Sequence, residues 1–483
     1  MIPLRLDHLA HATGATLVDA DGQPVGPDAA ERRLLIDGPV VTDSRECRPG
    51  SLYVARVGEH ADGHAFVGAA REAGAVAALT SRPVTGMAHL VVDDVQTAFG
   101  AVARAVVDAA VDLTLVGITG SSGKTSTKDL LAQVLGASAD TVAPEGSYNG
   151  EIGVPLTVCR ITPTTRFLVA EMGSRGIGHI AYLTRIAPPR IGIVLNVGQA
   201  HIGEFGGRDN IASAKAELVQ ALPADGVAIL NADDAVVAAM ASGTRARVVF
   251  VGESTTADVR AEDVTLDDSG RPSFRVLTPV GVARVTLRLH GQHHVGNALA
   301  VIAAALECGL TLEAITTALA AAGPLSRWRM EVTERADGVT VVNDAYNANP
   351  DSMGAALRAL SAMKRPTAVA RERRTWAVLG EMFELGPDSR TEHEQVGAIA
   401  VAHSVDRLVV VGAGAGPIGD GAQAAGMPPA HLARVADTDA AYALLTENLR
   451  RGDVVLFKSS RDAGLRWLGD RVAKTVYGSE VGS

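Results

Sequence analysis

A glycine-rich loop directly after an apolar run is the feature that most constrains this chain. The run Leu113 to Ile118 leads into Gly120-Ser121-Ser122-Gly123-Lys124-Thr125-Ser126, and a helical pattern follows from Asp129 to Leu135. Glycines let backbone N–H groups surround an anion, the start of a helix favours negative charge, Lys124 adds a cation, and the Thr125 hydroxyl can bind Mg²⁺. The spacing differs from the common Gly-x-x-x-x-Gly-Lys pattern, because residue 118 is Ile. We therefore predict a variant nucleoside triphosphate loop rather than a plain glycine turn.

Composition limits the possible partners of the chain. With 483 residues, the chain is too long for a single core, and 47% hydrophobic residues are ordinary for a globular protein. The net charge of −10 argues against nucleic acid and anionic membrane surfaces as partners. An anionic ligand must therefore be met by a local basic site.

The N-terminus and the cysteines bear on the cellular compartment. Arg5 and Asp7 interrupt the region where a signal peptide needs an apolar core, and no run of about 18 apolar residues occurs elsewhere. Cys47, Cys159 and Cys308 are isolated, which favours reduced thiols over disulfides or a zinc site. We expect a cytoplasmic protein without a membrane span.

Alternating strand-like and helical stretches predict an α/β fold with three domains. We expect a small α/β domain at 1–108, a central P-loop-type ATPase domain with a mostly parallel sheet at 109–326, and a C-terminal Rossmann-like α/β domain at 327–483. Residues 249 to 290 are typical of β-ribbons, and Asn297 to Leu306 is typical of a helix. The expected strands lie at 52–55, 75–79, 113–118, 167–170, 191–195, 226–230, 339–342, 375–379, 407–411 and 453–457.

Several further motifs accompany the phosphate loop. They are Asp43-Ser44-Arg45, Asp62-Gly63-His64, Gly146-Ser147-Tyr148-Asn149-Gly150, Glu171-Met172-Gly173, Asn196-Val197-Gly198-Gln199-Ala200-His201, Asp344-Ala345-Tyr346-Asn347-Ala348-Asn349-Pro350, Leu379-Gly380-Glu381-Met382-Phe383-Glu384-Leu385-Gly386 and Phe457-Lys458-Ser459-Ser460-Arg461. Together they resemble the Mur ligase family over essentially the whole chain. Asn347, where other branches carry His, resembles the branch that adds D-alanyl-D-alanine.

The resemblance implies an ATP-dependent ligase. Its substrates would be UDP-MurNAc-tripeptide and D-alanyl-D-alanine, its product UDP-MurNAc-pentapeptide, and its route an acyl phosphate in peptidoglycan precursor synthesis. It implies residues 1–108 as a UDP-sugar-binding domain. We expect neither a nucleic acid partner nor oligomerisation. Two alternatives stay open: a sibling ligase that adds an amino acid, and a P-loop regulatory ATPase.

The resemblance also implies the ATP and magnesium sites. Lys124 would contact the β- and γ-phosphates, Thr125 and Glu171 would hold one Mg²⁺, and His201 a second, although a capping histidine is the alternative. Lys215 matches a position that is carbamylated in relatives. The sequence around it, without the resemblance, favours a solvated lysine on a helix. The predicted ATP-binding residues are Gly120, Ser121, Ser122, Gly123, Lys124, Thr125, Ser126, Asn297, Arg329, Asp344 and Asn347.

The C-terminal domain would close this site. Arg329 would reach the γ-phosphate, with Arg327 as a competing candidate, and domain closure would exclude water from the acyl phosphate. We expect the catalytic set to be Lys124, Glu171, His201, Lys215 and Arg329. The predicted substrate-binding residues are Ser44, Arg45, His64, Asn149, Asn349, Lys458 and Arg461.

Some residues depart from the family pattern. Gly150 and His294 occupy positions where relatives often carry Asn, and His179 one where Glu is common. The adjacent His293 and His294 invite a metal interpretation, but neighbours at a helix start point in different directions. We therefore do not expect a metal site there.

Overall fold

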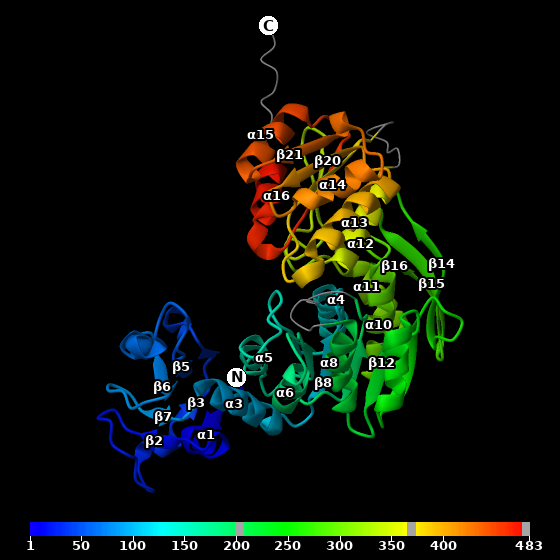
Figure 1. The fold of residues 1–483 in the computed structure, drawn as a ribbon. Coiled ribbons are helices and arrows are strands. Elements are labelled where there is room, and N and C mark those ends of the chain that lie inside the picture. Colours follow the sequence, from blue (N-terminus) through cyan, green and yellow to red (C-terminus); the bar gives the residue numbers. More distant parts are fainter. Residues whose placement is uncertain (199–206, 365–372, 476–483) are drawn as a thin grey trace.

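The fold has three α/β parts, each with its own sheet (Figure 1). It is known from a computed structural model that describes residues 1–198, 207–364 and 373–475. The C-terminal part lies above the central part in Figure 1, and the N-terminal part lies beside the central one. The predicted fold class, with a parallel central sheet and a Rossmann-like end, is confirmed.

The N-terminal part has a five-stranded sheet in the order β2-β7-β6-β5-β4, in which only β2 pairs antiparallel. Helix α3 packs on α5 and α6 of the central part, and Gln96 Nε2 donates to the Glu151 carbonyl at 2.7 Å. The elements are β1 (Leu4–Arg5), α1 (Leu6–Thr13), β2 (Thr16–Val18), β3 (Leu35–Ile36), β4 (Val40–Val41), β5 (Ser51–Val54), α2 (Val67–Glu72), β6 (Ala75–Thr80), β7 (His89–Val91) and α3 (Val95–Ala109).

The central part has a nine-stranded sheet in the order β16-β15-β14-β13-β12-β11-β8-β10-β9. Its pairs are parallel from β9 to β14, and β14, β15 and β16 form the expected antiparallel ribbon. The elements are β8 (Thr114–Thr119), α4 (Lys124–Gly136), β9 (Thr141–Val142), α5 (Gly153–Val158), β10 (Phe167–Glu171), α6 (His179–Ile186), β11 (Ile191–Val194), α8 (Arg208–Gln220), β12 (Val227–Asn231), α9 (Ala235–Ala239), β13 (Arg247–Gly252), β14 (Val259–Leu266), β15 (Pro272–Thr278), β16 (Gly281–Thr286), α10 (His294–Glu307) and α11 (Leu312–Ala321).

The C-terminal part has a six-stranded sheet in the order β17-β18-β22-β19-β20-β21, parallel except for β17. Strand β21 was not predicted, because its residues are mostly half-exposed and carry no apolar run. The elements are β17 (Glu331–Glu334), β18 (Thr340–Asn343), α12 (Pro350–Ala362), β19 (Thr375–Leu379), α13 (Ser389–Ala402), β20 (Arg407–Val411), α14 (Gly416–Ala424), β21 (Leu432–Val435), α15 (Thr438–Asn448), β22 (Val454–Lys458) and α16 (Leu465–Ala473).

The core explains why these strands were recognisable. Every residue of β10, β19 and β22 is buried, as expected for parallel strands covered by helices on both faces. Polar groups that follow such strands emerge at one edge of the sheet, where open α/β sheets bind ligands.

All three cysteines are free thiols, as expected. In the described part of the chain, no helix is long and apolar enough to cross a membrane.

Candidate functional site

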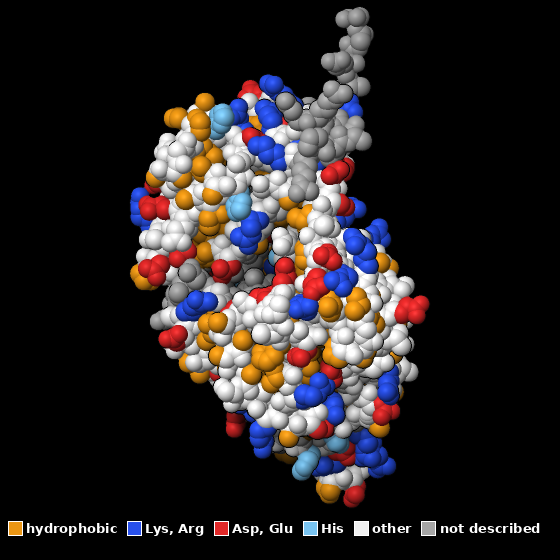
Figure 2. All heavy atoms as spheres, turned by 90° about the vertical axis from the view of Figure 1, so that its right-hand side faces the viewer, with side chains coloured by type: hydrophobic (Ala, Val, Ile, Leu, Met, Phe, Trp, Pro, Cys, Tyr) orange, Lys and Arg blue, Asp and Glu red, His pale blue; other side chains and the backbone are white. Residues whose placement is uncertain are grey.

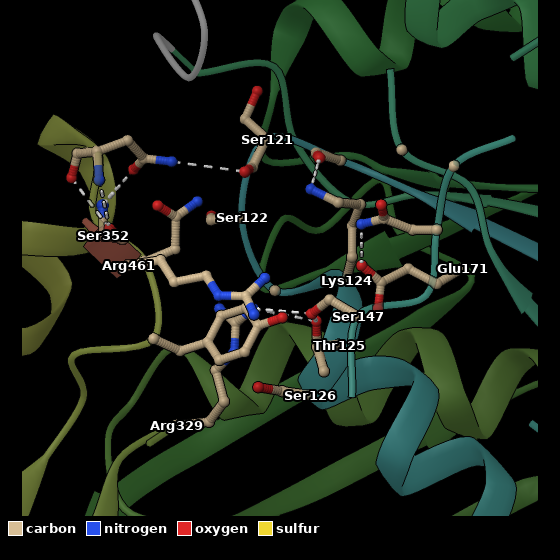
Figure 3. Close-up of a pocket in the computed structure, with 18 of the residues that line it drawn as sticks. Ser121, Ser122, Lys124, Thr125, Ser126, Ser147, Glu171, Arg329, Ser352 and Arg461 are labelled. Atoms are coloured by element: carbon tan, nitrogen blue, oxygen red, sulfur yellow. Dashed lines mark hydrogen bonds between the residues drawn. The ribbon is translucent and has the colours of Figure 1, made fainter. Parts of the chain in front are cut away.

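The phosphate loop, Gly120–Ser126, joins β8 to the start of α4 (Figure 3). Gly123 is the residue before the helix and has a φ of 80°, a left-handed conformation that disfavours side chains. A Cβ atom there would also lie 2.7 Å from Asn297 Oδ1. Both observations explain a glycine at this position, and they place Asn297 of α10 against the loop.

Polar contacts from neighbouring segments hold the loop. Asn196, after β11, accepts a hydrogen bond from Ser122 N at 2.9 Å and donates to its carbonyl at 3.2 Å. Ser121 Oγ accepts from Gly198 N at 2.9 Å, and Lys124 Nζ donates to the Gly120 carbonyl at 2.7 Å. The loop is therefore fixed in shape by the protein itself.

Glu171 provides a buried acid at the end of β10, beside the strand that leads into the loop. Asn149 Nδ2 donates to its Oε1 at 2.7 Å, whereas Oε2 has no hydrogen-bond partner among the described residues. A fully buried carboxylate oxygen without a partner is costly unless a cation or donor meets it. The donor set of Glu171 and the Thr125 hydroxyl suits Mg²⁺, which prefers hard oxygen ligands.

Arg329 reaches this site from the C-terminal part. Its Nη2 donates to Ser147 Oγ at 3.1 Å and to Thr125 Oγ1 at 3.3 Å, and these two hydroxyls lie 2.8 Å apart. The guanidinium carbon also lies 4.3 Å from the centre of the Tyr346 ring, within cation–π range. The fold thus brings a cation of the C-terminal part onto the helix that follows the phosphate loop.

Burial perturbs two lysines here. Burial, with Arg329 nearby, lowers the pKa of Lys124 below its usual value, although Glu171 opposes the shift. Burial and the charge of Lys124 lower the pKa of Lys215, on α8, well below its usual value. Lys215 is 6% exposed, which rules out the solvated helix lysine.

The end of β22 anchors the segment after β18. Lys458 Nζ donates to Asp344 Oδ2 at 2.6 Å and to the Asn347 carbonyl at 3.2 Å, and Asp344 Oδ1 accepts from Met330 N at 3.0 Å. Burial lowers the pKa of Lys458 although Asp344 opposes the shift. Lys458 is thus engaged inside the protein and is not a solvated surface cation.

Asn349 connects the C-terminal part to the phosphate loop. Its side chain caps α12 by accepting from Ser352 N at 2.8 Å, and its Nδ2 lies 3.5 Å from the Ser121 carbonyl. Asn347 is exposed, and the Arg461 guanidinium lies 5.8 Å from the centre of the Tyr346 ring.

A cavity of about 900 Å³ joins these groups. Figure 2 shows a recess between the upper and lower parts of the molecule with charged side chains at its rim. The predicted residues that line the cavity are Gly120, Ser121, Ser122, Gly123, Lys124, Thr125, Ser126, Asn149, Glu171, Lys215, Asn297, Arg329, Asp344, Asn347, Asn349, Lys458 and Arg461.

The N-terminal candidates lie outside the lining of this cavity. Arg45 is exposed and pairs with Asp43, whereas His64 is buried between Asp62 and Ser81, with Nδ1 2.6 Å from Asp62 Oδ1. Ser44 is buried in a short helical turn. His201 lies outside the described residues.

Thr42 and Arg56 line the cavity instead, and sequence reasoning missed them. Their only signal was position, since Thr42 precedes the Asp43-Ser44-Arg45 motif and Arg56 directly follows the strand expected at 52–55. Ser147 and Tyr346 were within recognised motifs, but their contacts with Arg329 depend on how the two parts pack.

The phosphate loop, the buried acid after a parallel strand and the arginine from another domain define a P-loop-type nucleotide-binding enzyme. The family model for the Mur ligase middle domain matches residues 118–305, the model for the Mur ligase, glutamate ligase domain matches 328–461, and the model for the Mur ligase family, catalytic domain matches 39–112. The chain belongs to the Mur ligase family.

Individual relatives agree with this assignment. The UDP-N-acetylmuramoyl-tripeptide--D-alanyl-D-alanine ligase of Mycobacterium tuberculosis strain H37Rv is 47% identical, over 99% of each chain. A crystal structure of MurF from Acinetobacter baumannii superposes with a TM-score of 0.85 at 30% identity, covering 98% of this chain and 99% of that one. The crystal structure of MurF from Thermotoga maritima in complex with ADP superposes with a TM-score of 0.79 at 27% identity, covering 91% of this chain and 98% of that one.

Proposed function

We propose that this chain joins D-alanyl-D-alanine to the terminal carboxylate of the tripeptide in UDP-MurNAc-tripeptide, with ATP converted to ADP and phosphate. The observation that carries the proposal is the meeting of the phosphate loop, the Glu171 carboxylate and Arg329 in one cavity. The similarity to D-alanyl-D-alanine ligases over nearly the full length supports the choice of substrates.

The reaction needs an activated carboxylate, because a carboxylate is a poor electrophile with a poor leaving group. A tripeptide carboxylate oxygen attacks the γ-phosphorus of ATP, ADP leaves, and an acyl phosphate forms. The dipeptide amine then attacks the acyl carbon, loses a proton, and phosphate leaves as the peptide bond forms. Lys124 and Arg329 stabilise the negative oxygens, and closure of the C-terminal part over the cavity would keep water from the acyl phosphate.

Magnesium would be held by Thr125 and Glu171, and a second ion by His201. When bound, it would neutralise phosphate charge during transfer. A carbamate on Lys215 belongs to this proposal, because its buried amine lines the same cavity as Lys124, Thr125 and Glu171. No group of three or more His, Cys, Asp or Glu in the described ranges forms a metal cluster. Water and phosphate oxygens would complete the coordination, as is usual for Mg²⁺.

The remaining predicted residues divide between ATP and the two substrates. We propose that Asn297, Asp344 and Asn347 shape the nucleotide site. Arg461 is a better candidate than Lys458 for the dipeptide carboxylate, because the Lys458 amine already donates to Asp344. Asn149 and Asn349 would act near the reacting centre.

We propose that Ser44, Arg45 and His64 contact the UDP-linked substrate outside this cavity. Thr42 and Arg56 would contact the same substrate at the cavity wall. We also propose domain boundaries at 108/109 and 326/327, between the three large sheets. The use of ATP fits a cytoplasmic location, which stays part of the proposal.

A phosphate-release assay with product mass tests this function. Purified protein, ATP and Mg²⁺ would be combined with UDP-MurNAc-tripeptide and D-alanyl-D-alanine, and each substrate would be omitted in turn. We expect release only with both, together with a UDP-MurNAc-pentapeptide. Release with a single amino acid and a shorter precursor would instead identify a sibling activity, and release that ignores every precursor would contradict the ligase.

A further inference from the structure

Two consecutive buried residues of α4, Lys128 and Asp129, each hold a different segment of the chain. Lys128 Nζ donates to the Pro144 carbonyl at 2.8 Å and forms an ion pair with Asp129. The second oxygen of Asp129 accepts from Ser326 N at 3.1 Å. The two side chains are only 2% and 11% exposed, so they are held in place by their partners rather than by water.

Gln133, one helical turn further along α4, holds the same linker at a second point. Its Nε2 donates to the Gly323 carbonyl at 2.9 Å, and its Oε1 accepts from Gly323 N at 3.1 Å. One amide side chain therefore satisfies both backbone groups of one linker residue. The linker, Gly323–Met330, is the stretch that joins the central part to the C-terminal part.

Two of the backbone groups held by α4 each lie the same number of residues before a side chain of the site. Ser147 comes three residues after Pro144, and Arg329 comes three residues after Ser326. Both side chains then meet at Thr125, at the start of the helix that carries the anchors.

The backbone on both sides of Arg329 also needs support. Trp328 has a φ of 59° and Met330 a φ of 50°, in the left-handed region that side chains disfavour. Asp344 holds the far end of the linker by accepting from Met330 N at 3.0 Å. Such a backbone persists only when its two ends are fixed.

We infer that Lys128, Asp129 and Gln133 are positioning residues that fix the Pro144 segment and the linker so that Ser147 and Arg329 reach the nucleotide. The inference deepens the proposed function and depends on it for its activity readout. The helix that follows the phosphate loop thereby couples that loop to the arginine of the C-terminal part.

Gln133→Ala is the test, because replacing Asp129 would leave Lys128 as a buried unpaired cation and the variant could fail to fold. It is combined with Arg329→Lys in a double-mutant cycle. We measure kcat and, separately, the Kd of a non-hydrolysable ATP analogue with Mg²⁺. We expect Gln133→Ala alone to lower kcat by about 10-fold, since a misplacement of about 1 Å can cost about 100-fold, and to lower it less than about twofold further in the Arg329→Lys background.

Asp140→Asn is the matched control. The side chain of Asp140 accepts hydrogen bonds from three threonine hydroxyls of the central part, all within residues 162–165 and none in the linker. Its effect on kcat should be the same in both backgrounds, whatever its effect on Tm. An equal loss for Gln133→Ala in both backgrounds, or a loss below about twofold in the unaltered protein, would overturn the inference. If the protein makes no pentapeptide, the proposed function fails. The same comparison of the two backgrounds, made with the Kd of the ATP analogue in place of kcat, then decides the inference.

Discussion

The phosphate-loop side of the cavity and the N-terminal part of the molecule are built differently. On the loop side, Glu171 and Thr125 are buried, and each contacts a residue from another segment. On the N-terminal side, Arg45 is exposed and pairs with Asp43, only two residues away. Interlocked buried groups hold one geometry, whereas exposed local ion pairs contribute little energy. We therefore expect substitutions on the loop side to affect the chemical step, and those on the N-terminal side to affect substrate binding or nothing.

Lys124→Met should have the largest effect. A cation about 4 Å from a phosphate charge is worth about 4 kcal/mol at an effective dielectric of 20, which corresponds to about 1000-fold in rate. Ligase assays at saturating ATP would measure the fall in kcat. Lys364→Met removes a lysine from a half-exposed pair with Asp406 and should change kcat less than twofold. A Lys124→Met protein with more than a tenth of normal activity would contradict the expectation that loop-side residues control the chemical step.

Glu171→Gln should lower kcat by about 100-fold, because the amide cannot replace a charged Mg²⁺ ligand. Asn149 can still donate to the remaining oxygen, so the fold should persist by circular dichroism. Titration with Mg²⁺ should recover part of the rate. Glu313→Gln, on the exposed first turn of α11, is the control. A normal Mg²⁺ dependence in Glu171→Gln would argue against a metal at this carboxylate.

Arg56→Ala and Arg45→Ala sharpen the comparison on the N-terminal side. Arg56 lines the cavity, so its loss should raise the KM for UDP-MurNAc-tripeptide by about 5-fold to 10-fold through a lost contact with an anion. Arg45 is proposed to contact the same substrate outside the cavity, but it is exposed and already paired with Asp43, so its loss should raise that KM less, by about twofold to threefold. The reverse order would show that the substrate passes over Arg45 rather than along the cavity wall.

A pH effect from His294 should be the smallest. Burial and the neighbouring His293 lower the pKa of His294 well below 6.5. Below pH 6.5 the unfolded chain binds a proton there and the folded protein does not, so the stability of the folded protein decreases as the pH is lowered. From pH 6.5 to 5.5 this group should remove about 1 kcal/mol of unfolding free energy.

Denaturant unfolding of the protein and of His294→Asn at both pH values would measure this loss. Asn297 donates to the His294 ring at 3.3 Å, and an Asn oxygen can accept instead, so the variant should fold. It should lose about 1 kcal/mol less than the unaltered protein. Equal losses would show that other groups account for the pH dependence.

Much of the fold could be predicted because parallel strands are buried on both faces and therefore form long apolar runs. The runs at 167–170 and 453–457 became β10 and β22 almost residue for residue. Polar residues directly after such runs, such as Glu171 and Lys458, were also found at the cavity, because strand ends share one edge of the sheet.

Other parts of the site could not be predicted in this way. His64 was predicted to bind substrate because of the motif in which it lies, and sequence patterns did not show that both of its ring nitrogens contact protein groups. The contact of Lys458 with substrate stays a prediction, whereas the hydrogen bond from its amine to Asp344 was not predicted. Asp62 is a near neighbour of His64, but Ser81 lies 17 residues from His64 and Asp344 lies 114 residues from Lys458, and local patterns do not encode such contacts.

The sequence by itself determined the phosphate loop, the buried parallel strands and the acid that ends β10, since these depend on local spacing and on the burial of apolar runs. Only the tertiary structure decided which cations meet which oxygens. The contact of Arg329 with Thr125 joins residues 204 positions apart, and the contact of Gln133 with Gly323 joins residues 190 apart. Such contacts exist only after the separate sheets have packed, because the free energy that fixes them comes from burial shared between domains.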